Sequence, residues 1–215
     1  MFPQCDDKIF SQIDFKNTNQ QQKPQFSILV GRFLNYIIVM GEIRKCADVK
    51  LIVAVMYRRD FDLGAAVDQL VSLYGDIERS CGPVEFSWSN YYEGEMGVDL
   101  LKYYVIFRDT VCRSRLPAIK IGTNDIERRF SKDGRRVVNI DPGYLAVDKL
   151  VLASTKDFYH RLYLGDGIFG EVTLHYRRGR FRHFSWTYPD YQSPEFQKFL
   201  EAARADAFFH PSFVI

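Results

Sequence analysis

The sequence contains few cysteines, and their spacing excludes two classes of site. The four cysteines, Cys5, Cys46, Cys81 and Cys112, form neither a C-x-x-C pair nor a Cys/His series with zinc-ligand spacing. They are also too sparse for the disulfide framework of small secreted domains. A reducing compartment is the simplest environment for such a chain, and we expect a cytoplasmic protein.

Long apolar runs and a strong excess of one charge are absent as well. The most apolar stretch near the N-terminus, residues 28–40, is short and contains Arg32. A membrane-spanning helix needs about 20 apolar residues, and a signal peptide begins with its charged and apolar regions. The formal net charge of +2 is too small to indicate a nucleic-acid or membrane partner by itself. We expect no membrane partner, and nucleic-acid binding would have to rest on local basic clusters.

A phosphate-binding P-loop is also missing. Its pattern G-x-x-x-x-G-K-[ST] places backbone amides around phosphates, and no such run occurs in the chain. A P-loop GTPase is therefore excluded, whereas binding of a nucleotide by another arrangement stays open.

The composition is that of a folded domain with an extension at its N-terminus. Of 215 residues, 47% are hydrophobic and 26% are charged, the shares of an ordinary globular domain. Residues 16–25 are polar and rich in glutamine, a composition that buries too little apolar surface to fold. We expect a single α+β domain over residues 40–215, a natural start at Met40, and an extension over residues 1–39. The alternative is an arm that packs through residues 26–38.

The first half of this domain predicts the element order β-α-β-β-α-β. An apolar, β-branched run is typical of a strand buried on both faces, and a capped amphipathic segment that stops at Gly75 predicts the first helix. The expected elements are a strand at 49–57, a helix from Asp60 or Asp62 to Tyr74, a strand at 84–89 after a Gly82-Pro83 turn, a strand at 101–111, a helix at 117–130, and a strand that begins at 137. This order is that of the ferredoxin-like, split βαβ fold.

The last third predicts an antiparallel β-meander followed by a helix. Residues 158–164, 168–176 and 181–186 have strand-like composition, and the short links between them contain glycine, which is a hairpin signal. Ser193, directly before Pro194, is a suitable N-cap for a final helix to about residue 208.

The segment Asn139-Ile140-Asp141-Pro142-Gly143-Tyr144 is the first candidate site. Proline followed by glycine suits the two central positions of a type II turn, because the second requires a positive φ. Asp141 would then accept backbone hydrogen bonds in that turn. Alternatively, the turn would hold Asp141 and Tyr144 at the edge of a pocket.

A second group of polar side chains lies in residues 154–161, with Lys156, Asp157, His160 and Arg161. If Gly165 to Gly167 form the hairpin loop, Arg161 lies opposite Glu171, where a cross-strand ion pair would stabilise the sheet. His160 would then point to the other face, toward Val172, either as a hydrogen-bonded core residue or as a base.

Two tyrosine-rich loops are further candidates. Residues 186–191 place Asp190 between Tyr188 and Tyr191, and residues 91–97 combine Tyr92 with Glu95. Aromatic side chains with polar tips suit the walls of a pocket. They suit equally a loop that folds over the sheet.

Several ordered motifs together resemble a known family. They are MGEIRKCADVKLIVAVMY at 40–57, YYEGEMG at 91–97, NIDPGY at 139–144, KLVLASTKDFYHRLYL at 149–164, GIFGEVTLHYRRG at 167–179 and WTYPDYQS at 186–193. Over about residues 40–205 the chain resembles the uncharacterised bacterial and archaeal family called domain of unknown function 4416. The resemblance supports a domain that begins at Met40 and implies no particular reaction.

The leading hypothesis for function is the binding or processing of a small anionic ligand, such as a phosphorylated compound or a nucleotide. The site would be built from residues 139–161 and 186–191. Asp141, Lys156 and His160 are the catalytic candidates, and the ligand-binding candidates are Tyr92, Tyr144, Asp157, Arg161, Asp190 and Tyr191. If a metal takes part, Asp141 and Glu171 are its candidate ligands, and Mg²⁺ is the metal that uses one or two carboxylates together with a phosphate.

Two other functions stay open. Basic residues cluster at 128–136 and 177–182, near aromatic residues, as in modules that bind single-stranded RNA. The motifs could instead serve packing in a non-catalytic interaction or assembly protein. The sequence leaves undecided whether the protein is an enzyme and which oligomeric state it adopts.

Overall fold

The protein is described by a computed structural model that covers residues 47–88, 92–132 and 134–209. The predicted extension at residues 1–39 and the predicted start at Met40 lie outside the described residues. Within the described part, no helix has the length and apolar character that crossing a membrane would require.

The fold is α+β, with one antiparallel sheet of eight strands in the described residues. Its order is β2-β3-β1-β4-β5-β7-β6, and β8 pairs with β7. The strands are β1 (Val49–Arg58), β2 (Ile77–Glu85), β3 (Leu100–Val111), β4 (Val138–Leu145), β5 (Lys149–Ser154), β6 (Leu162–Gly165), β7 (Ile168–Arg177) and β8 (Arg180–His183). The helices are α1 (Leu63–Tyr74), α2 (Glu93–Met96), α3 (Leu116–Phe130) and α4 (Pro194–Phe209). The predicted α+β class is confirmed. The order β1-α1-β2-α2-β3-α3-β4 does not conflict with the predicted βαββαβ pattern, to which it adds the short helix α2.

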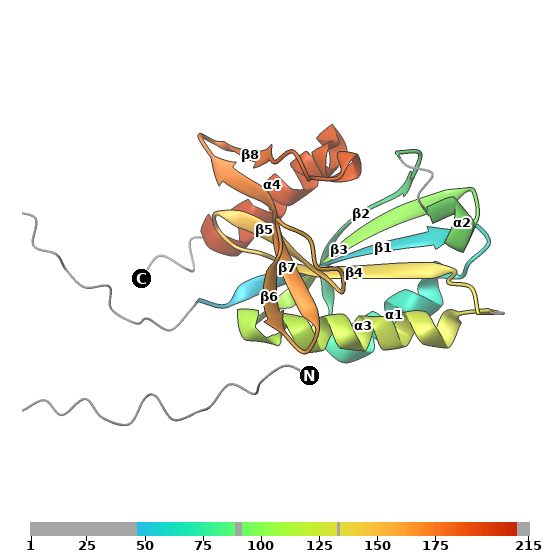
Figure 1. Cartoon of the computed structure of the whole chain (residues 1–215). Helices are drawn as coiled ribbons and strands as arrows, with labels where there is room; N and C mark the ends of the chain where they lie inside the picture. Colours follow the sequence, from blue (N-terminus) through green and yellow to red (C-terminus); the bar gives the residue numbers. More distant parts are fainter. Residues whose placement is uncertain (1–46, 89–91, 133, 210–215) are drawn as a thin grey trace, which may run out of the picture. The chain divides into compact units, whose positions relative to one another are not determined.

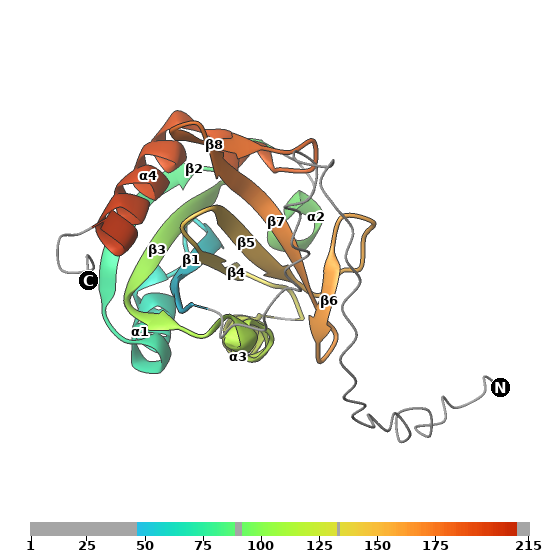
Figure 2. The ribbon, with the colours of Figure 1, turned by 90° about the vertical axis from the view of Figure 1, so that its left-hand side faces the viewer.

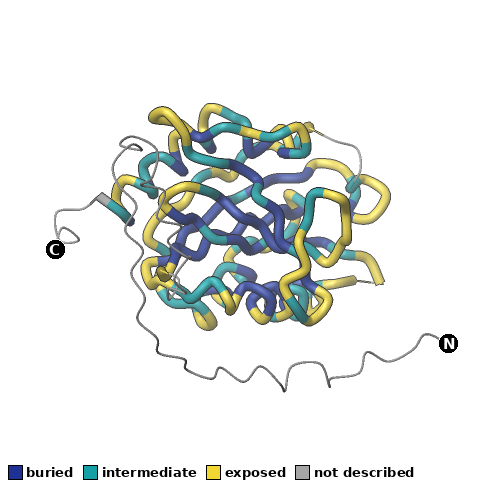
Figure 3. Tube along the Cα trace, turned by 60° about the vertical axis from the view of Figure 1, so that its left-hand side comes forward, coloured by how far each residue is buried: buried dark blue, intermediate teal, exposed yellow. Residues whose placement is uncertain are grey.

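The helices cover opposite faces of the sheet. Helices α1 and α3 lie together on one face, and α4 lies on the other (Figures 1 and 2). The alternation of β1 explains this arrangement, because successive side chains of a strand point to opposite faces. Leu51 and Val53 pack with α1 and α3, whereas Ile52 and Ala54 pack with α4. Both faces of β1 are therefore buried, as its apolar run predicts, and buried strands form the centre of the domain (Figure 3).

The helix ends follow local capping signals. Asp62 accepts a hydrogen bond from the backbone N–H of Ala65 and caps α1, which ends at Gly75 with φ of 88°. At the start of α4, the Ser193 hydroxyl accepts from the backbone N–H of Phe196. The predicted first and last helices are confirmed to within a residue or two at each end.

The predicted turn at Gly82-Pro83 is wrong, because both residues lie inside β2. The register between β2 and β3 is irregular between Cys81 and Val84, and β2 lies at one edge of the sheet. An edge strand tolerates proline, especially at a bulge, since the missing N–H removes no ladder bond there.

The predicted Pro142-Gly143 turn is also wrong, and its correction determines the shape of the site. Residues 138–145 form one continuous strand, β4, in register with β1. Strand β5, which the local pattern did not predict, pairs with β4 only from Gly143 to Leu145. The next residue of β4 is Pro142, which has no N–H to donate. The two strands pair no further at this point.

Side chains of α3 replace β5 as partners of the β4 backbone beyond the proline. The N–H of Ile140 donates to Glu127 Oε1 at 2.7 Å, and its carbonyl accepts from Lys120 Nζ at 2.8 Å. Because N–H and C=O groups alternate in direction along a strand, Pro142 and Tyr144 direct their backbone groups to the same side as Ile140. Proline therefore stands at the position where the ladder with β5 ends and the bonds to α3 begin.

We predict that Gly143→Ala lowers the free energy of unfolding by about 1–3 kcal/mol. A Cβ at Gly143 would lie 2.3 Å from the carbonyl oxygen of Val151 and 3.2 Å from the Cα of Leu152, so the backbone of β4 or β5 must shift. Urea denaturation checks this. Gly94→Ala is the control, because a Cβ there meets no atom within 4 Å. Equal stability of the two variants would contradict the close approach of β4 and β5.

Candidate ligand-binding site

The floor of a cavity is formed where strand pairing places polar side chains in rows. Residues directly opposite each other in an antiparallel pair share a face of the sheet. Met56 of β1 is opposite both Lys102 and Asn139, and Ala54 is opposite both Tyr104 and Asp141. Lys102, Asn139 and Asp141 thus share the face away from α1, with Met56 between Lys102 and Asn139. Asn139 and Asp141 lie on β4, next to the gap where β4 and β5 separate.

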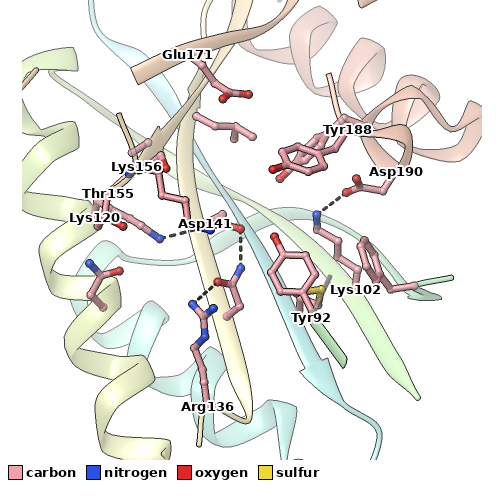
Figure 4. A pocket seen from close by; sticks show the side chains of 18 of the residues that line it. Tyr92, Lys102, Lys120, Arg136, Asp141, Thr155, Lys156, Glu171, Tyr188 and Asp190 are labelled. Atoms are coloured by element: carbon pink, nitrogen blue, oxygen red, sulfur yellow. Dashed lines mark hydrogen bonds and ion pairs between the residues drawn. The ribbon is translucent and has the colours of Figure 1, made fainter. Parts of the chain in front are cut away.

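The cavity itself has a volume of about 120 Å³. Its walls come from α3, from β5 and the turn after it, from β7, and from the 3₁₀ helix η3 (Pro189–Gln192). Figure 4 shows Lys120 and Lys156 on one side of Asp141, and Tyr188, Asp190 and Lys102 on the other. The lining residues are Met56, Phe86, Tyr92, Lys102, Lys120, Asn124, Arg136, Asn139, Asp141, Leu152, Ala153, Ser154, Thr155, Lys156, Arg161, Glu171, Tyr188, Asp190 and Tyr191.

Asp141 is held at the centre of this cavity by a chain of hydrogen bonds. Lys120 Nζ donates to its Oδ1 at 3.1 Å, and Asn139 Nδ2 donates to its Oδ2 at 2.6 Å. Arg136 Nη1 in turn donates to Asn139 Oδ1 at 2.7 Å. Burial acts to raise the pKa of Asp141, but the charges of Lys120 and Lys102 and the two hydrogen bonds outweigh it and lower the pKa. Asp141 therefore stays ionised and fixed in orientation.

On the opposite wall, Lys102 and Asp190 form a buried ion pair with side-chain exposures of 7% and 5%. Tyr104 donates to the same Asp190 oxygen at 2.9 Å. The Lys102 ammonium also lies 4.4 Å from the centroid of the Tyr191 ring and 5.6 Å from that of Phe86. A buried charge needs such compensation, because desolvation costs several kcal/mol per ion.

The predicted ion pair between Arg161 and Glu171 is confirmed, with Nε 2.8 Å from Oε2. Arg161 Nη1 also donates to Ser154 Oγ and to the carbonyl of Lys156, each at 2.9 Å. The predicted direction of His160 is wrong, because its Nε2 lies 3.2 Å from the same Glu171 oxygen. Residues 159–160 form a turn before β6 instead of extending the strand, so strand alternation does not apply to them.

Two tyrosines, Tyr92 and Tyr191, line the cavity beside its charged groups. Tyr191 is 2% exposed, and its hydroxyl has no hydrogen-bond partner within the described residues. Burial raises the pKa of Tyr191, as do the negative charges of Asp190 and Asp141. The pKa of Tyr92 is likewise raised, first by burial and then by the charge of Asp141. Both phenols are therefore neutral donors at physiological pH.

The structure brings most of the predicted site residues together. Those that line the cavity are Tyr92, Asp141, Lys156, Arg161, Glu171, Asp190 and Tyr191. Tyr144 does not, because it lies three residues beyond Asp141 on an extended strand and projects from the opposite face, against Leu116 and Val151. Asp157 is exposed on the turn after β5. His160 contacts Glu171 from outside the cavity and stacks on Phe158 and Trp186.

Three cationic residues of the cavity were not predicted: Lys102, Lys120 and Arg136. Lys102 lies in the apolar first part of β3, residues 100–107. Lys120 shares a helical stripe with Leu116, Thr123 and Glu127, all of them buried. A lysine within a buried stripe is a signal in the sequence, since lysine is almost never fully buried without a partner. The residues next to Lys102 and Lys120 in the sequence do not show which side chains pair with them.

The three carboxylates of the cavity already have cationic partners, which disfavours a metal ion beside them. Within the part of the chain that the structure describes, no group of three His, Cys, Asp or Glu side chains is arranged to hold a metal. A Mg²⁺ ion on Asp141 would lie beside the Lys120 ammonium, and one on Glu171 would lie beside the Arg161 guanidinium. Both contacts are repulsive.

The two basic clusters differ in how their charges are compensated. In residues 128–136, Arg128 pairs with Asp125, and Arg136 pairs with Glu95 and Glu127. In residues 177–182, none of the arginines forms an ion pair with a described carboxylate. A shallow depression on this β7–β8 hairpin is lined by His175, Arg177, Arg178, Arg182 and His183.

Comparison with known proteins identifies a family. The model of the family described as domain of unknown function 4416 matches residues 47–206. This span contains every element described above up to the last turn of α4 and confirms the resemblance of the sequence motifs. No curated protein and no solved structure matches the chain.

We predict that Asp141→Asn lowers the free energy of unfolding at pH 7 by about 1–3 kcal/mol, because Lys120 loses the nearer of its two carboxylate partners. The folded-state pKa of Asp141 lies below its unfolded value, near 3.9. Its contribution is therefore complete above about pH 4 and is lost as the pH falls further. Urea denaturation of both proteins between pH 3 and pH 7 checks this. A stability difference that is constant over the whole range would show that the Asp141 charge is not involved.

Proposed function

Since the chain belongs to the family described as domain of unknown function 4416, which assigns no activity, we propose from the site geometry that the cavity binds a small anionic ligand. A phosphorylated compound is the class that fits best. Asp141, Lys102 and Lys120 form the base of the site, and Lys156 and Arg161 form its cationic wall.

The observation that carries this proposal is the excess of cations in the cavity. Five lining side chains are cationic, namely Lys102, Lys120, Arg136, Lys156 and Arg161, and three are acidic, namely Asp141, Glu171 and Asp190. Walls of low dielectric strengthen the attraction of such a cleft for an anion. Arg136 is also paired with Glu95 and Glu127, which lie outside the lining. The other four cations and the three carboxylates leave an excess of one positive charge, which a ligand with one negative charge would balance.

Donors with spare capacity point in the same direction. Arg161 uses Nε and Nη1 for Glu171, Ser154 and the backbone of Lys156, and its Nη2 forms no bond within the described residues. Asn124 of α3 lines the cavity, and its amide makes no described hydrogen bond either. A guanidinium fixed by its other nitrogen atoms is well suited to bind a phosphate oxygen.

The size of the cavity limits the ligand. At about 120 Å³ it is smaller than the roughly 300–1,000 Å³ of sites for drug-sized molecules. A phosphate ester with a short body would be enclosed, whereas a nucleotide would have to extend out of the opening.

The chemistry of the site favours binding over bond cleavage. A general base must lie within hydrogen-bond reach of the substrate proton and have a pKa near the working pH. Asp141 has a lowered pKa, and His160 does not line the cavity. A cytoplasmic location belongs to the same proposal. Within the described residues Cys81 and Cys112 form no disulfide, as is usual in a reducing compartment.

We expect inorganic phosphate and small phosphomonoesters to raise the melting temperature of the protein, since a ligand that binds only the folded state stabilises it. Lys156→Ala should weaken their binding about tenfold, because a charge-assisted contact is lost. Lys156 is exposed on the turn after β5, so the variant should fold. Isothermal titration calorimetry measures the affinity.

Lys198→Ala serves as the matched control, because Lys198 is an exposed lysine on α4 outside the cavity. It should bind phosphate esters like the wild type. The proposal fails if a broad set of phosphates and carboxylates leaves the melting temperature of the wild type unchanged.

A second candidate function is the binding of single-stranded RNA on the β7–β8 hairpin. The uncompensated arginines at 177, 178, 180 and 182 favour it, because phosphate contacts by such side chains provide most of the affinity for nucleic acid. The cluster at 128–136 contributes less, since Arg128 and Arg136 already have carboxylate partners.

If this second function holds, the triple variant Arg177→Ala, Arg178→Ala and Arg182→Ala should lose RNA binding in a filter assay at about 50 mM salt. The slope of log affinity against log salt should fall by about 2, near 0.7 for each phosphate contact removed. Arg128→Ala is the control with little expected effect. Absence of RNA retention by the wild type would remove this candidate.

A further inference from the structure

We infer that the ligand of the proposed site carries a hydroxyl group close to its anionic group, as a phosphorylated polyol or sugar does, and that Tyr191 and Asp141 bind that hydroxyl. The inference rests on the proposed function and names the class of ligand within it. It follows from the one buried hydroxyl of the cavity that the described residues leave without a partner.

The Tyr191 ring is held firmly, which fixes the place of its hydroxyl. Its ring packs against Tyr104 and Phe196, with centroid distances of 5.8 and 5.1 Å, and the Lys102 ammonium lies over its face. The side chain is 2% exposed, and its hydroxyl has no hydrogen-bond partner within the described residues. Leaving such a group unsatisfied costs as much as a lost hydrogen bond. A group that enters the cavity and bonds to this hydroxyl therefore gains affinity.

The charges around Tyr191 determine what that group must be. Burial raises the pKa of this phenol, and the charges of Asp190 and Asp141 raise it further, so the hydroxyl is present as a donor. The ligand must offer an acceptor at this position. The two nearest ammonium groups are already paired with these carboxylates, Lys102 with Asp190 and Lys120 with Asp141. They give little net attraction for an anionic oxygen at this position, which favours a neutral oxygen.

Asp141 narrows the choice from any neutral oxygen to a hydroxyl. Each of its oxygen atoms accepts one bond within the protein, Oδ1 from Lys120 and Oδ2 from Asn139. A carboxylate oxygen can accept about two, and 29% of the Asp141 side chain is exposed. A hydroxyl can accept from Tyr191 and donate to Asp141 at once, whereas a carbonyl or ether oxygen can do only the first.

The anionic group then belongs on the other side of Asp141. Lys120 and Lys156 lie there (Figure 4), and Arg161 of the same wall has an unused Nη2. Between the two ends, the rings of Phe86, Tyr92 and Tyr188 line the cavity and offer apolar faces to the C–H groups of a polyol. A short phosphorylated polyol fits the volume of the cavity. Its phosphate would lie near Lys156 and Arg161, and its hydroxyl near Tyr191 and Asp141.

Calorimetric titration with paired probes tests this assignment. Glycerol 3-phosphate and ribose 5-phosphate carry hydroxyl groups, and n-propyl phosphate has the same phosphate without them. We expect the wild type to bind at least one of the hydroxylated probes about tenfold or more tightly than n-propyl phosphate, the size of one satisfied buried hydrogen bond.

The variant Tyr191→Phe removes only the hydroxyl and keeps the packed ring. It should bind n-propyl phosphate like the wild type and lose the preference for the hydroxylated probe. Because the hydroxyl has no partner within the described residues, the melting temperature without ligand should stay the same or rise. Tyr159→Phe, at a tyrosine that is 89% exposed, is the control that should change neither quantity.

The outcomes separate this inference from the proposed function. If no phosphate compound binds the wild type, the proposed function itself fails. If all three phosphates bind equally, or if Tyr191→Phe weakens all of them alike, the cavity binds phosphate but the assignment of a hydroxyl is overturned. Loss of the preference in Tyr191→Phe alone supports it.

Discussion

The missing N–H of Pro142 is the constraint on which the site depends. Strands β4 and β5 pair as far as Gly143 and Leu152, and the next ladder bond would require a donor that proline does not have. The strands separate there, and the separation leaves a cavity between them that α3 and η3 enclose. Without the proline, a continuous ladder would place β5 beside Asp141 and close the space.

Separation of two strands leaves backbone groups that need new partners, and α3 provides them as charged side chains. Glu127 accepts from the N–H of Ile140, and Lys120 donates to its carbonyl and to Asp141. Glu127 and Lys120 are therefore buried beside β4 because the unpaired backbone groups of Ile140 need hydrogen-bond partners. Lys120 also lines the cavity. A side chain that bonds to the backbone of β4 in place of β5 is thus also part of the polar site.

The cavity is chemically different at its two sides. Toward η3, the charge of Lys102 is matched by Asp190 and lies over aromatic rings, so that side is buried and its charges are paired. Toward β5, Lys156 is exposed and Arg161 keeps a nitrogen without a described partner. The η3 side, where the charges are paired, determines the shape of the cavity. The β5 side, which is cationic and accessible, attracts an anion. This difference is why a ligand with one anionic and one uncharged polar end fits the site.

Local features determined the elements that the sequence predicts correctly, and long-range pairing decided the rest. The strand at 49–57 and the helix from Asp62 to Gly75 follow from periodicity and caps, which are properties of neighbouring residues. Arg161 and Glu171 were predicted as partners because a hairpin links them. The turn expected at Pro142-Gly143 is a strand instead, since pairing with β1 outweighs the preference of two residues. Lys102 meets Asp190 from 88 positions away, and only the packing of η3 over the sheet brings those two charges together.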